Sequence, residues 1–298
     1  MIFSGDNVVL IDASALIFRS YYVNGDRLTR PSDGAAVGAV VGVVQALIRL
    51  CEPGVLLGRP FTHIVACLDV PGPTTRHDID PLYKAHRTTH PSALSAQRPW
   101  IINAFEAFGV RTVGLAGYEA DDIIATYTRQ AVDAGAEVSI MSADKDLMQL
   151  VSPQVSLVDH GKRIGPAEVM EKFGVPPALL GDFLALVGDP SDGIQGVTGV
   201  GKKTASALLN RYGSLEAVLS EGGEDSSLGK ARRHAVARYG HLAIKARQLV
   251  SLTEDVPLAI SLNECTWNGL DRARAYEWLV GMEFAGLAAG IEKTISGD

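Results

Sequence analysis

Acidic side chains in this sequence gather where short apolar runs end. The runs at 8–11, 64–68 and 138–143 are each followed by an aspartate, and the segments 117–122 and 188–192 hold further acids. Carboxylate oxygens without histidine or cysteine partners are typical ligands of Mg²⁺ or Mn²⁺ rather than zinc. Two such ions about 4 Å apart hydrolyse phosphodiesters, one activating water and the other stabilising the leaving oxygen. The candidate metal ligands are Asp12, Asp69, Glu119, Asp121, Asp122, Asp144, Asp146, Asp189 and Asp192.

Each acidic motif also has a structural explanation when it is taken alone. Acids in the first turn of a helix cap it and complement its dipole, which would account for Glu119, Asp121 and Asp122. An aspartate at the end of a strand, such as Asp12 or Asp69, often begins a turn. Convergence at one sheet edge favours a metal site, because two carboxylates about 4 Å apart repel by up to ~4 kcal/mol at an effective dielectric near 20. Bound cations would remove that repulsion.

The elements that must position these acids follow from the apolar pattern. Short apolar runs alternate with longer helical patterns, which predicts an α/β fold with a mostly parallel sheet flanked by helices. Helical periodicity replaces the strands from about residue 166, so we expect a core at 1–180 and a helical region at 181–298. The expected strands are Val8–Asp12, His63–Asp69, Val110–Val113, Glu137–Met141 and, at the sheet edge, Val155–Asp159. The expected helices include Ser14–Tyr22, Ala35–Cys51, Leu94–Phe108 and Glu119–Ala134.

The net charge of −7 does not by itself exclude a nucleic-acid partner. Phosphate contacts need lysine and arginine, and these residues are unevenly distributed. They concentrate at 76–98, at Lys202–Lys203 and at 230–238, and the first of these stretches is also rich in proline. A long irregular segment inside a compact domain is usually functional or mobile.

Other features limit the class of protein. The N-terminus shows no secretory signal, and the small-residue run Gly34–Ile48 is too short to span a bilayer. The three cysteines have no spacing typical of a disulfide framework or a zinc site. We therefore expect no membrane association, a cytoplasmic and nucleoid-associated location, and a monomer.

Six motifs occur in an order that is specific when they are taken together. They are Leu10-Ile11-Asp12-Ala13-Ser14, Asp69 followed by Arg76-His77, Tyr83-Lys84-Ala85-His86-Arg87, Gly117 to Asp122, Ala143-Asp144-Lys145-Asp146-Leu147 and Gly188 to Asp192. From about residue 8 to about 285 the chain resembles the 5′-nuclease (5′-3′ exonuclease) domain of bacterial DNA polymerase I and, more distantly, the flap endonucleases. A free-standing paralogue of that domain is favoured, and a fragment of a longer chain is left open.

The resemblance implies a PIN-like fold and two divalent ions, Mg²⁺ or Mn²⁺. By this resemblance Asp12, Asp69, Glu119 and Asp121 hold the first ion. Asp144, Asp146 and Asp192 hold the second, with Asp121 near both. Asp122 and Asp189 match further acidic positions that act through water.

The resemblance also assigns residues to the DNA substrate. Segment 71–98 resembles a helical arch over a single-stranded 5′ end. Lys84 and Arg87, three residues apart and expected on one helix face, would clamp the scissile phosphate. Tyr83 would stack on an unpaired base, and Arg76 would make a phosphate or structural contact. The competing interpretation of this segment is a solvated basic helix face.

The run Gly196 to Ala205 resembles a helix-hairpin-helix in the C-terminal helical region. Gly196, Gly199 and Gly201 would permit the tight turn, and Lys202 and Lys203 would contact the duplex backbone. The resemblance further implies a K⁺ ion at this loop. The spacing does not meet the phosphate-binding loop pattern G-x-x-x-x-G-K-[ST] in full.

Two departures from the family pattern stand at Gly193-Ile194-Gln195, where Asn-(Leu/Ile)-Pro is usual, and at Val41, where tyrosine is common. The leading hypothesis is a structure-specific 5′-nuclease acting on branched, nicked or 5′-ended DNA in replication and repair. The alternatives are a PIN-like ribonuclease and a catalytically inactive DNA-binding scaffold. Flap-length preference, the balance of exonuclease and endonuclease action, and protein partners are not determined by the sequence.

Overall fold

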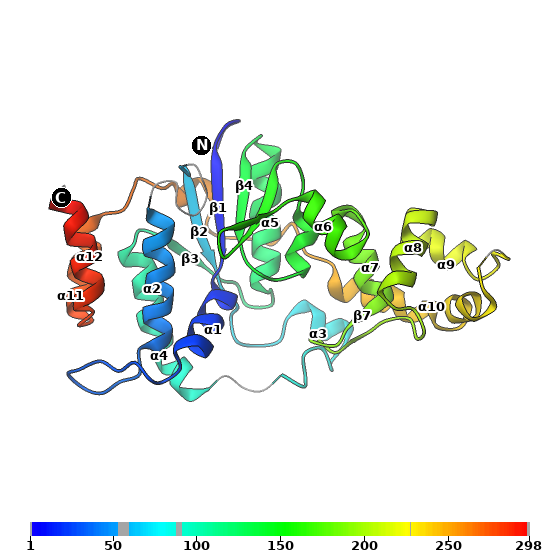
Figure 1. Ribbon diagram of the computed structural model, residues 1–298, viewed down its shortest axis with the longest axis horizontal. Helices are drawn as coiled ribbons and strands as arrows, with labels where there is room; N and C mark the ends of the chain where they lie inside the picture. The colour runs from blue at the N-terminus through cyan, green and yellow to red at the C-terminus, as the bar shows by residue number, and fades with distance from the viewer. Residues whose placement is uncertain (1, 53–59, 88–90, 227, 297–298) are drawn as a thin grey trace.

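A computed structural model describes residues 2–52, 60–87, 91–226 and 228–296. Six strands form one sheet in the order β3-β2-β1-β4-β5-β6 (Figure 1). Strands β1 to β5 are parallel to their neighbours, and β6 alone is antiparallel. The predicted mostly parallel α/β sheet is therefore confirmed. The strands are β1 (Asn7–Asp12), β2 (His63–Cys67), β3 (Arg111–Val113), β4 (Glu137–Met141), β5 (Val155–Asp159) and β6 (Lys162–Ile164).

The expectation that Val155–Asp159 forms the sheet edge was wrong. Strand β6 pairs with β5 and takes that edge through a two-residue turn at His160 and Gly161. Both turn residues have positive φ, 48° and 78°, which is the geometry of a type I′ hairpin. The short charged sequence of β6 carries no apolar alternation, so the strand was not predicted.

Helices cover both faces of the sheet because its central strands are apolar on both sides. Along β1, Val8 and Leu10 belong to one core, and Val9 and Ile11 belong to the other. The first core contains α5 (Ala120–Asp133) and the 3-10 helix η1 (Asp146–Leu150). The second contains α1 (Ala13–Asn24), α2 (Gly38–Cys51) and α4 (Ser92–Ala107).

The glycines of the run 34–48 serve close packing between two helices. A Cβ added at Gly42 would lie 2.6 Å from Ser20 Cβ on α1, and one at Gly38 would lie 2.2 Å from Gly25 O. Only glycine at these two positions lets α2 pack this closely against α1 and the residue that follows it. Val41 is a partly buried residue of α2 on the same core. Within the residues that the structure describes, no helix could cross a membrane.

A helical region continues from the sheet without a break in the apolar core. The core that contains Leu10 and Ile140 also contains Phe183, Leu208 and Val236. Figure 1 shows α8 and α9 at the end of the molecule farthest from α11 and α12. The helices of this region are α6 (Pro166–Phe173), η2 (Pro177–Leu179), α7 (Leu180–Val187), α8 (Lys202–Tyr212), α9 (Leu215–Glu221) and α10 (Lys230–Val250).

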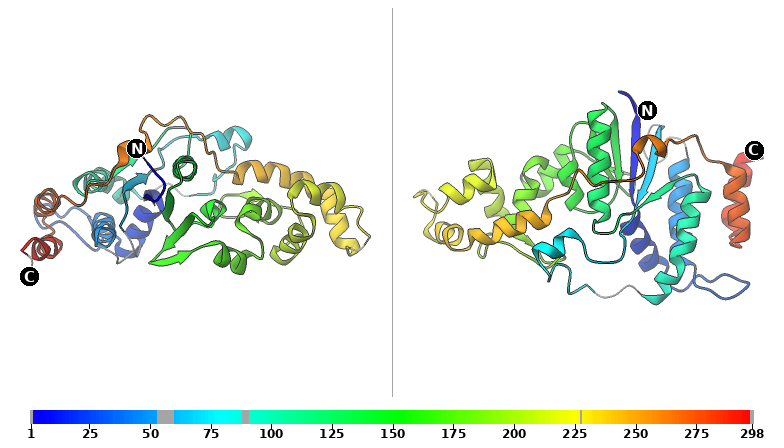
Figure 2. Two further views of the ribbon diagram at one scale, coloured as in Figure 1. Left: turned by 90° about the horizontal axis from the view of Figure 1, so that it is seen from above. Right: turned by 180° about the vertical axis from the view of Figure 1, so that it is seen from behind.

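The last part of the chain returns to the sheet domain. After η3 (Leu262–Cys265), α11 (Arg272–Gly281) packs on α4, and α12 (Ala285–Ser296) packs on α11. Trp267 N donates to Thr62 O at 2.7 Å beside β2. The expected region 181–298 therefore contains helices that join the second core, and Figure 2 shows this end of the chain on the sheet side of the molecule.

Segment 71–98 is not one helix. It contains α3 (Thr75–Ile79), consecutive turns at 81–86 and the start of α4, and part of the expected arch, 88–90, lies outside the described residues. Seen from behind, α3 lies beside the end of α10 (Figure 2). Lys245 Nζ on α10 contacts Asp80 Oδ2 at 2.9 Å, and this ion pair holds the residue that follows α3 against the helical region.

Candidate metal centre

The carboxyl ends of β1, β2 and β4 meet at one edge because these strands are parallel neighbours. Asp12 ends β1, Asp69 lies just beyond β2, Asp144 follows β4, and Asp121 lies in the first turn of α5. The charges of Asp69 and Asp144 act on Asp12. The charges of all three act on Asp121. The fold thus gathers these four predicted ligands into one cluster.

Hydrogen bonds from neighbouring segments orient this cluster. Asp12 Oδ1 accepts from Ala15 N at 2.9 Å at the start of α1, and Oδ2 accepts from Ser142 Oγ at 2.7 Å. Ser142 Oγ in turn accepts from Asp144 N at 3.0 Å. Ser142 was not predicted, although its place before Asp144 in a loop after a strand is a signal for this kind of local turn.

The cluster is electrostatically unfavourable by itself. Burial, reinforced by repulsion from Asp69 and Asp144, raises the pKa of Asp12 to about 6. Burial and four neighbouring acids raise the pKa of Asp121 well above its ordinary value. Because opposite charges stabilise a carboxylate and like charges destabilise it, this cluster would gain stability from bound cations.

A second, adjoining group consists of Asp146, Asp189 and Asp192. One carboxylate oxygen from each lies within 4.8 Å of the other two. Asp146 begins η1, and the other two stand in or beside a small ribbon of β7 (Gly188–Asp189) and β8 (Ile194–Gln195). Burial and the charge of Asp144 raise the pKa of Asp146 to about 7, so this group continues the first cluster.

The ribbon includes the departure at Gly193-Ile194-Gln195. Gly193 has a φ of 74° in the turn, Ile194 is buried, and Asp189 pairs with Ile194 across the ribbon. The substituted residues therefore keep Asp192 at the cluster, and Asp192 is buried with a relative exposure of 6 %.

Lys145 forms ion pairs with two members of the second group. Its Nζ lies 2.6 Å from Asp189 Oδ2 and 3.4 Å from Asp146 Oδ1. Burial acts to lower the pKa of Lys145, but Asp146 and Asp189 outweigh it and raise the pKa. Burial also acts to raise the pKa of Asp189, yet hydrogen bonds from Lys145 and Ser191 lower it overall.

Lys84 and Arg87 form ion pairs with two of the predicted metal ligands, Glu119 and Asp192. Lys84 Nζ lies 2.7 Å from Glu119 Oε1 and 3.7 Å from Asp192 Oδ2, and the Arg87 guanidinium donates to Asp192. The expectation that they share a helix face was wrong, because both lie in or just after the turns at 81–86 and Lys84 has a φ of 55°. Lys84 N donates to Asp192 O at 3.0 Å, which anchors this turn to the ribbon.

Tyr83 does not present its ring for stacking. The side chain is buried, and its hydroxyl lies 3.1 Å from both Glu119 Oε2 and Asp192 Oδ2. The ring packs edge-on against His77 with centroids 5.6 Å apart. We therefore correct the predicted base-stacking role: the buried Tyr83 hydroxyl contacts two acids of the site, Glu119 and Asp192.

Asp122 and Arg76 form a buried ion pair beside Glu119, whose Oε2 lies 3.5 Å from Arg76 Nη1. Arg76 Nη1 and Nη2 donate to the two Asp122 oxygens at 2.7 and 2.8 Å, and both residues are buried. Arg76 also donates to the carbonyls of Leu249 and Ser251 at the end of α10. Of the two roles expected for Arg76, this geometry matches the structural one, and it engages both Asp122 oxygens that would have faced an ion.

The predicted hairpin joins α7 to α8. Gly199 has a φ of 87°, and a Cβ at Gly196 would lie 2.3 Å from Gly188 N, so both positions need glycine. Gly201 is the N-cap of α8, whose first two residues, Lys202 and Lys203, are exposed. The hairpin therefore presents two cations and a helix N-terminus to solvent.

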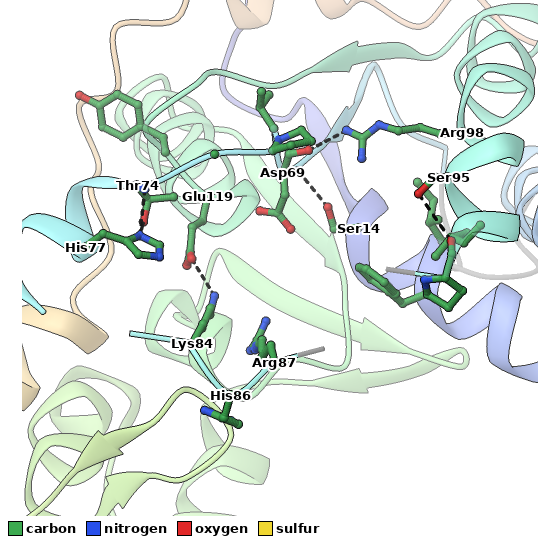
Figure 3. Close-up of a pocket in the computed structure, with 18 of the residues that line it drawn as sticks. Ser14, Asp69, Thr74, His77, Lys84, His86, Arg87, Ser95, Arg98 and Glu119 are labelled. Atoms are coloured by element: carbon green, nitrogen blue, oxygen red, sulfur yellow. Dashed lines mark hydrogen bonds and ion pairs between the residues drawn. The ribbon is translucent and has the colours of Figure 1, made fainter. Parts of the chain in front are cut away.

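A cavity of about 660 Å³ opens beside the first cluster. Figure 3 shows Asp69, Glu119, Lys84 and Arg87 with their charged ends turned into it. The lining of the cavity also includes Phe18 and Tyr22, which lie four residues apart on α1. These two aromatics were not predicted, although their helical spacing could have suggested a shared face.

Comparison with known proteins agrees with this architecture. Residues 7–174 match the sequence profile of the 5′-3′ exonuclease N-terminal resolvase-like domain, and residues 175–273 match its C-terminal SAM fold. DNA polymerase I of Rhizobium leguminosarum is 38 % identical over 298 residues, covering 99 % of this chain and 29 % of that protein. A 5′-3′ exonuclease of Streptomyces coelicolor is 36 % identical over 271 residues, covering 84 % of this chain and 87 % of that protein.

Solved structures share the fold at lower identity. The T5 D15 protein co-crystallised with metal ions has a TM-score of 0.66 at 18 % identity, with 98 % of each chain covered. The catalytic core of Rad2 in complex with DNA substrate has a TM-score of 0.57 at 11 % identity, covering 94 % of this chain and 87 % of that one. The chain spans about three tenths of the DNA polymerase I relatives that it matches. On the two profile matches and the Streptomyces relative, this chain belongs to the 5′-3′ exonuclease family.

Proposed function

We propose that this protein is a divalent-metal-dependent nuclease that hydrolyses DNA at 5′ ends and at 5′ flaps. The observation that carries the proposal is the convergence of acids from five separate segments at one sheet edge, beside a cavity with two cations in its wall. Its relatives support the DNA substrate: one is a 5′-3′ exonuclease, and a solved structure with a TM-score of 0.64 is the T5 D15 flap endonuclease in complex with DNA and metal ions.

The donor set fits two hard divalent ions. Asp12, Asp69, Glu119 and Asp121 would hold the first ion, and Asp144 together with the second group, Asp146, Asp189 and Asp192, would hold the second. Asp146 Oδ1 is buried and, among the described residues, accepts no hydrogen bond, although Lys145 Nζ lies 3.4 Å from it as an ion pair. Oxygen-only ligands favour Mg²⁺ or Mn²⁺. When bound, two such ions activate water and stabilise the leaving oxygen.

The cations of the cavity wall would hold the scissile phosphate. Lys84 and Arg87 contact Glu119 and Asp192, so a phosphate at this cluster lies within their reach. Pre-positioned cations of this kind stabilise the charge that develops in the transition state. The adjoining cavity, about 660 Å³, has room for an unpaired nucleotide, and Phe18 and Tyr22 offer aromatic surface to its base.

The duplex part of the substrate would lie on the helical region. Lys202 and Lys203 flank the hairpin, and two exposed residues of α10, Lys230 and Arg238, add further positive charge. Such contacts bind the phosphate backbone without reading sequence. We retain K⁺ at the hairpin loop, a monomeric state and a cytoplasmic location as parts of the proposal.

The decisive experiment is a cleavage assay on labelled flaps, nicks, gaps and blunt duplexes, with matched RNA flaps and with or without Mg²⁺. We expect metal-dependent cutting of DNA flaps and 5′ ends, and a loss of at least about a hundredfold for Asp144→Asn with little change in DNA binding. Asp159→Asn, which alters an acid at the end of β5 paired with Arg19, is the matched control. Preferential RNA cutting would favour the ribonuclease alternative, and absence of cutting would favour the inactive scaffold.

A further inference from the structure

Lys145 forms ion pairs with carboxylates that a second divalent ion would need as ligands. Its Nζ is 2.6 Å from Asp189 Oδ2 and 3.4 Å from Asp146 Oδ1. The other oxygen of Asp189 accepts from Ser191 Oγ at 2.6 Å and from Ser191 N at 3.0 Å. Both Asp189 oxygens are therefore already engaged within the chain, and one of them is engaged by a positive charge.

A divalent ion and the Lys145 ammonium group would both bind the carboxylate oxygens of Asp146 and Asp189. An ion coordinated by the second group needs oxygen lone pairs at about 2.0–2.2 Å for Mg²⁺, and it is repelled by a cation beside those oxygens. Lys145 directly precedes Asp146 in the chain. It therefore competes without the loss of translational entropy that a free ion undergoes when it binds. Either the ion or the ammonium can hold Asp189 Oδ2 closely, but both together are unfavourable.

We propose that Lys145 is a built-in counter-ion that competes with the second divalent ion for Asp146 and Asp189. The inference rests on the proposed two-ion centre. Lys145 neutralises this part of the cluster, and it lowers the affinity of the second position for its ion. Its side chain is 34 % exposed, compared with 3 % for Asp189, so the ammonium has a path into solvent when an ion displaces it.

Calorimetric titration of the whole chain with Mn²⁺, in the absence of DNA, measures this competition directly. We expect Lys145→Met to lower the Kd of the weaker position about tenfold and to leave the tighter position within twofold. Lys145→Arg keeps the charge and should keep the weak second Kd. Lys162→Met, the same change at an exposed position on β6, is the matched control and should leave both Kd values unchanged.

Thermal stability supplies an independent readout. In EDTA, Lys145→Met should melt at a lower temperature than Lys162→Met, because Asp146 and Asp189 lose their partner, and Mn²⁺ should raise its melting temperature by more. A Lys145→Met chain that is unfolded in EDTA and folds on addition of Mn²⁺ supports the same conclusion, whereas unfolding that Mn²⁺ does not reverse overturns it.

The outcomes separate the two proposals. Equal Mn²⁺ affinities in wild type and Lys145→Met would overturn the counter-ion role and leave the two-ion centre standing. Absence of Mn²⁺ binding in every variant would overturn the two-ion centre, and with it the counter-ion role.

Discussion

Asp121 and Asp122 are adjacent on α5, yet removing the charge of each should change stability in opposite directions. Asp121 lies among acids, and burial together with their repulsion raises its pKa well above the ordinary value. Asp122 is fully buried against Arg76. We therefore compare Asp121→Asn with Asp122→Asn, two substitutions of the same size at neighbouring positions.

The cost at Asp122 follows from its hydrogen bonds. Oδ1 accepts from Arg76 Nη2 at 2.8 Å and from Thr253 N at 2.9 Å, and Oδ2 accepts from Arg76 Nη1 at 2.7 Å and from Glu119 N at 3.1 Å. Each oxygen faces two donors, so the amide nitrogen of asparagine meets donors in either orientation. Breaking a buried ion pair in this way costs about 3–5 kcal/mol, which corresponds to a fall of roughly 10 °C in melting temperature.

The effect at Asp121 should have the opposite sign when divalent ions are removed. The carboxylate is repelled by Asp12, Asp69 and Asp144, so replacing it by a neutral amide removes repulsion at about the same volume. We expect the free energy of unfolding to rise by about 1 kcal/mol or more, since pairwise repulsion near 4 Å reaches up to ~4 kcal/mol at an effective dielectric of 20.

Urea unfolding and calorimetry in EDTA at pH 7.5 measure both changes. In Mg²⁺, Asp121→Asn should also lose the stabilisation that wild type gains from the ion. The reasoning is refuted if Asp122→Asn lies within 1 kcal/mol of wild type, or if both variants shift in the same direction in EDTA.

Three other predictions concern pH, phosphate contact and duplex binding. In EDTA, the raised pKa values of about 6 for Asp12 and about 7 for Asp146 mean that the folded chain binds more protons than the unfolded chain between about pH 4 and 7. Stability should therefore fall by a few kcal/mol as pH rises through that window, and Mg²⁺ should flatten the dependence seen by calorimetry. Lys84→Ala should lower kcat by about 10²–10³-fold while duplex affinity, measured by fluorescence anisotropy, changes by less than about threefold, and an equal loss in both would contradict the assigned role. Replacing Lys202 and Lys203 together by alanine should weaken duplex binding and reduce the slope of log K against log salt by about 2, with unchanged slope as the opposing result.

Much of the metal cluster could be predicted because its determinants are local. An aspartate that directly follows a buried apolar run must lie at the carboxyl end of a strand, and parallel strands place those ends at one edge. Asp12, Asp69 and Asp144 all follow this rule. Two hairpin glycines could be predicted for a similar reason, because the close approach of Gly196 to Gly188 and the positive φ of Gly199 both exclude larger residues, whereas Gly201 has open space and a φ of −89°.

The partners of the charged side chains could not be predicted in the same way. Arg76 meets Asp122 across 46 positions of sequence, and Lys145 meets Asp189 across 44. Neither separation in sequence predicts that the two side chains meet. Tyr83 was expected to face the substrate, but its hydroxyl contacts Glu119 and Asp192 instead. The reason is that the turn carrying Tyr83 is anchored to the ribbon by the hydrogen bond from Lys84 N to Asp192 O.

The sequence alone determined the fold class, the strands that end in acids and the types of ligand available to an ion. Only the tertiary structure decided which acids remain for an ion and which are engaged by arginine or lysine. The physical reason is that successive residues on a helix point about 100° apart, so Asp121 and Asp122 enter different environments that distant segments create.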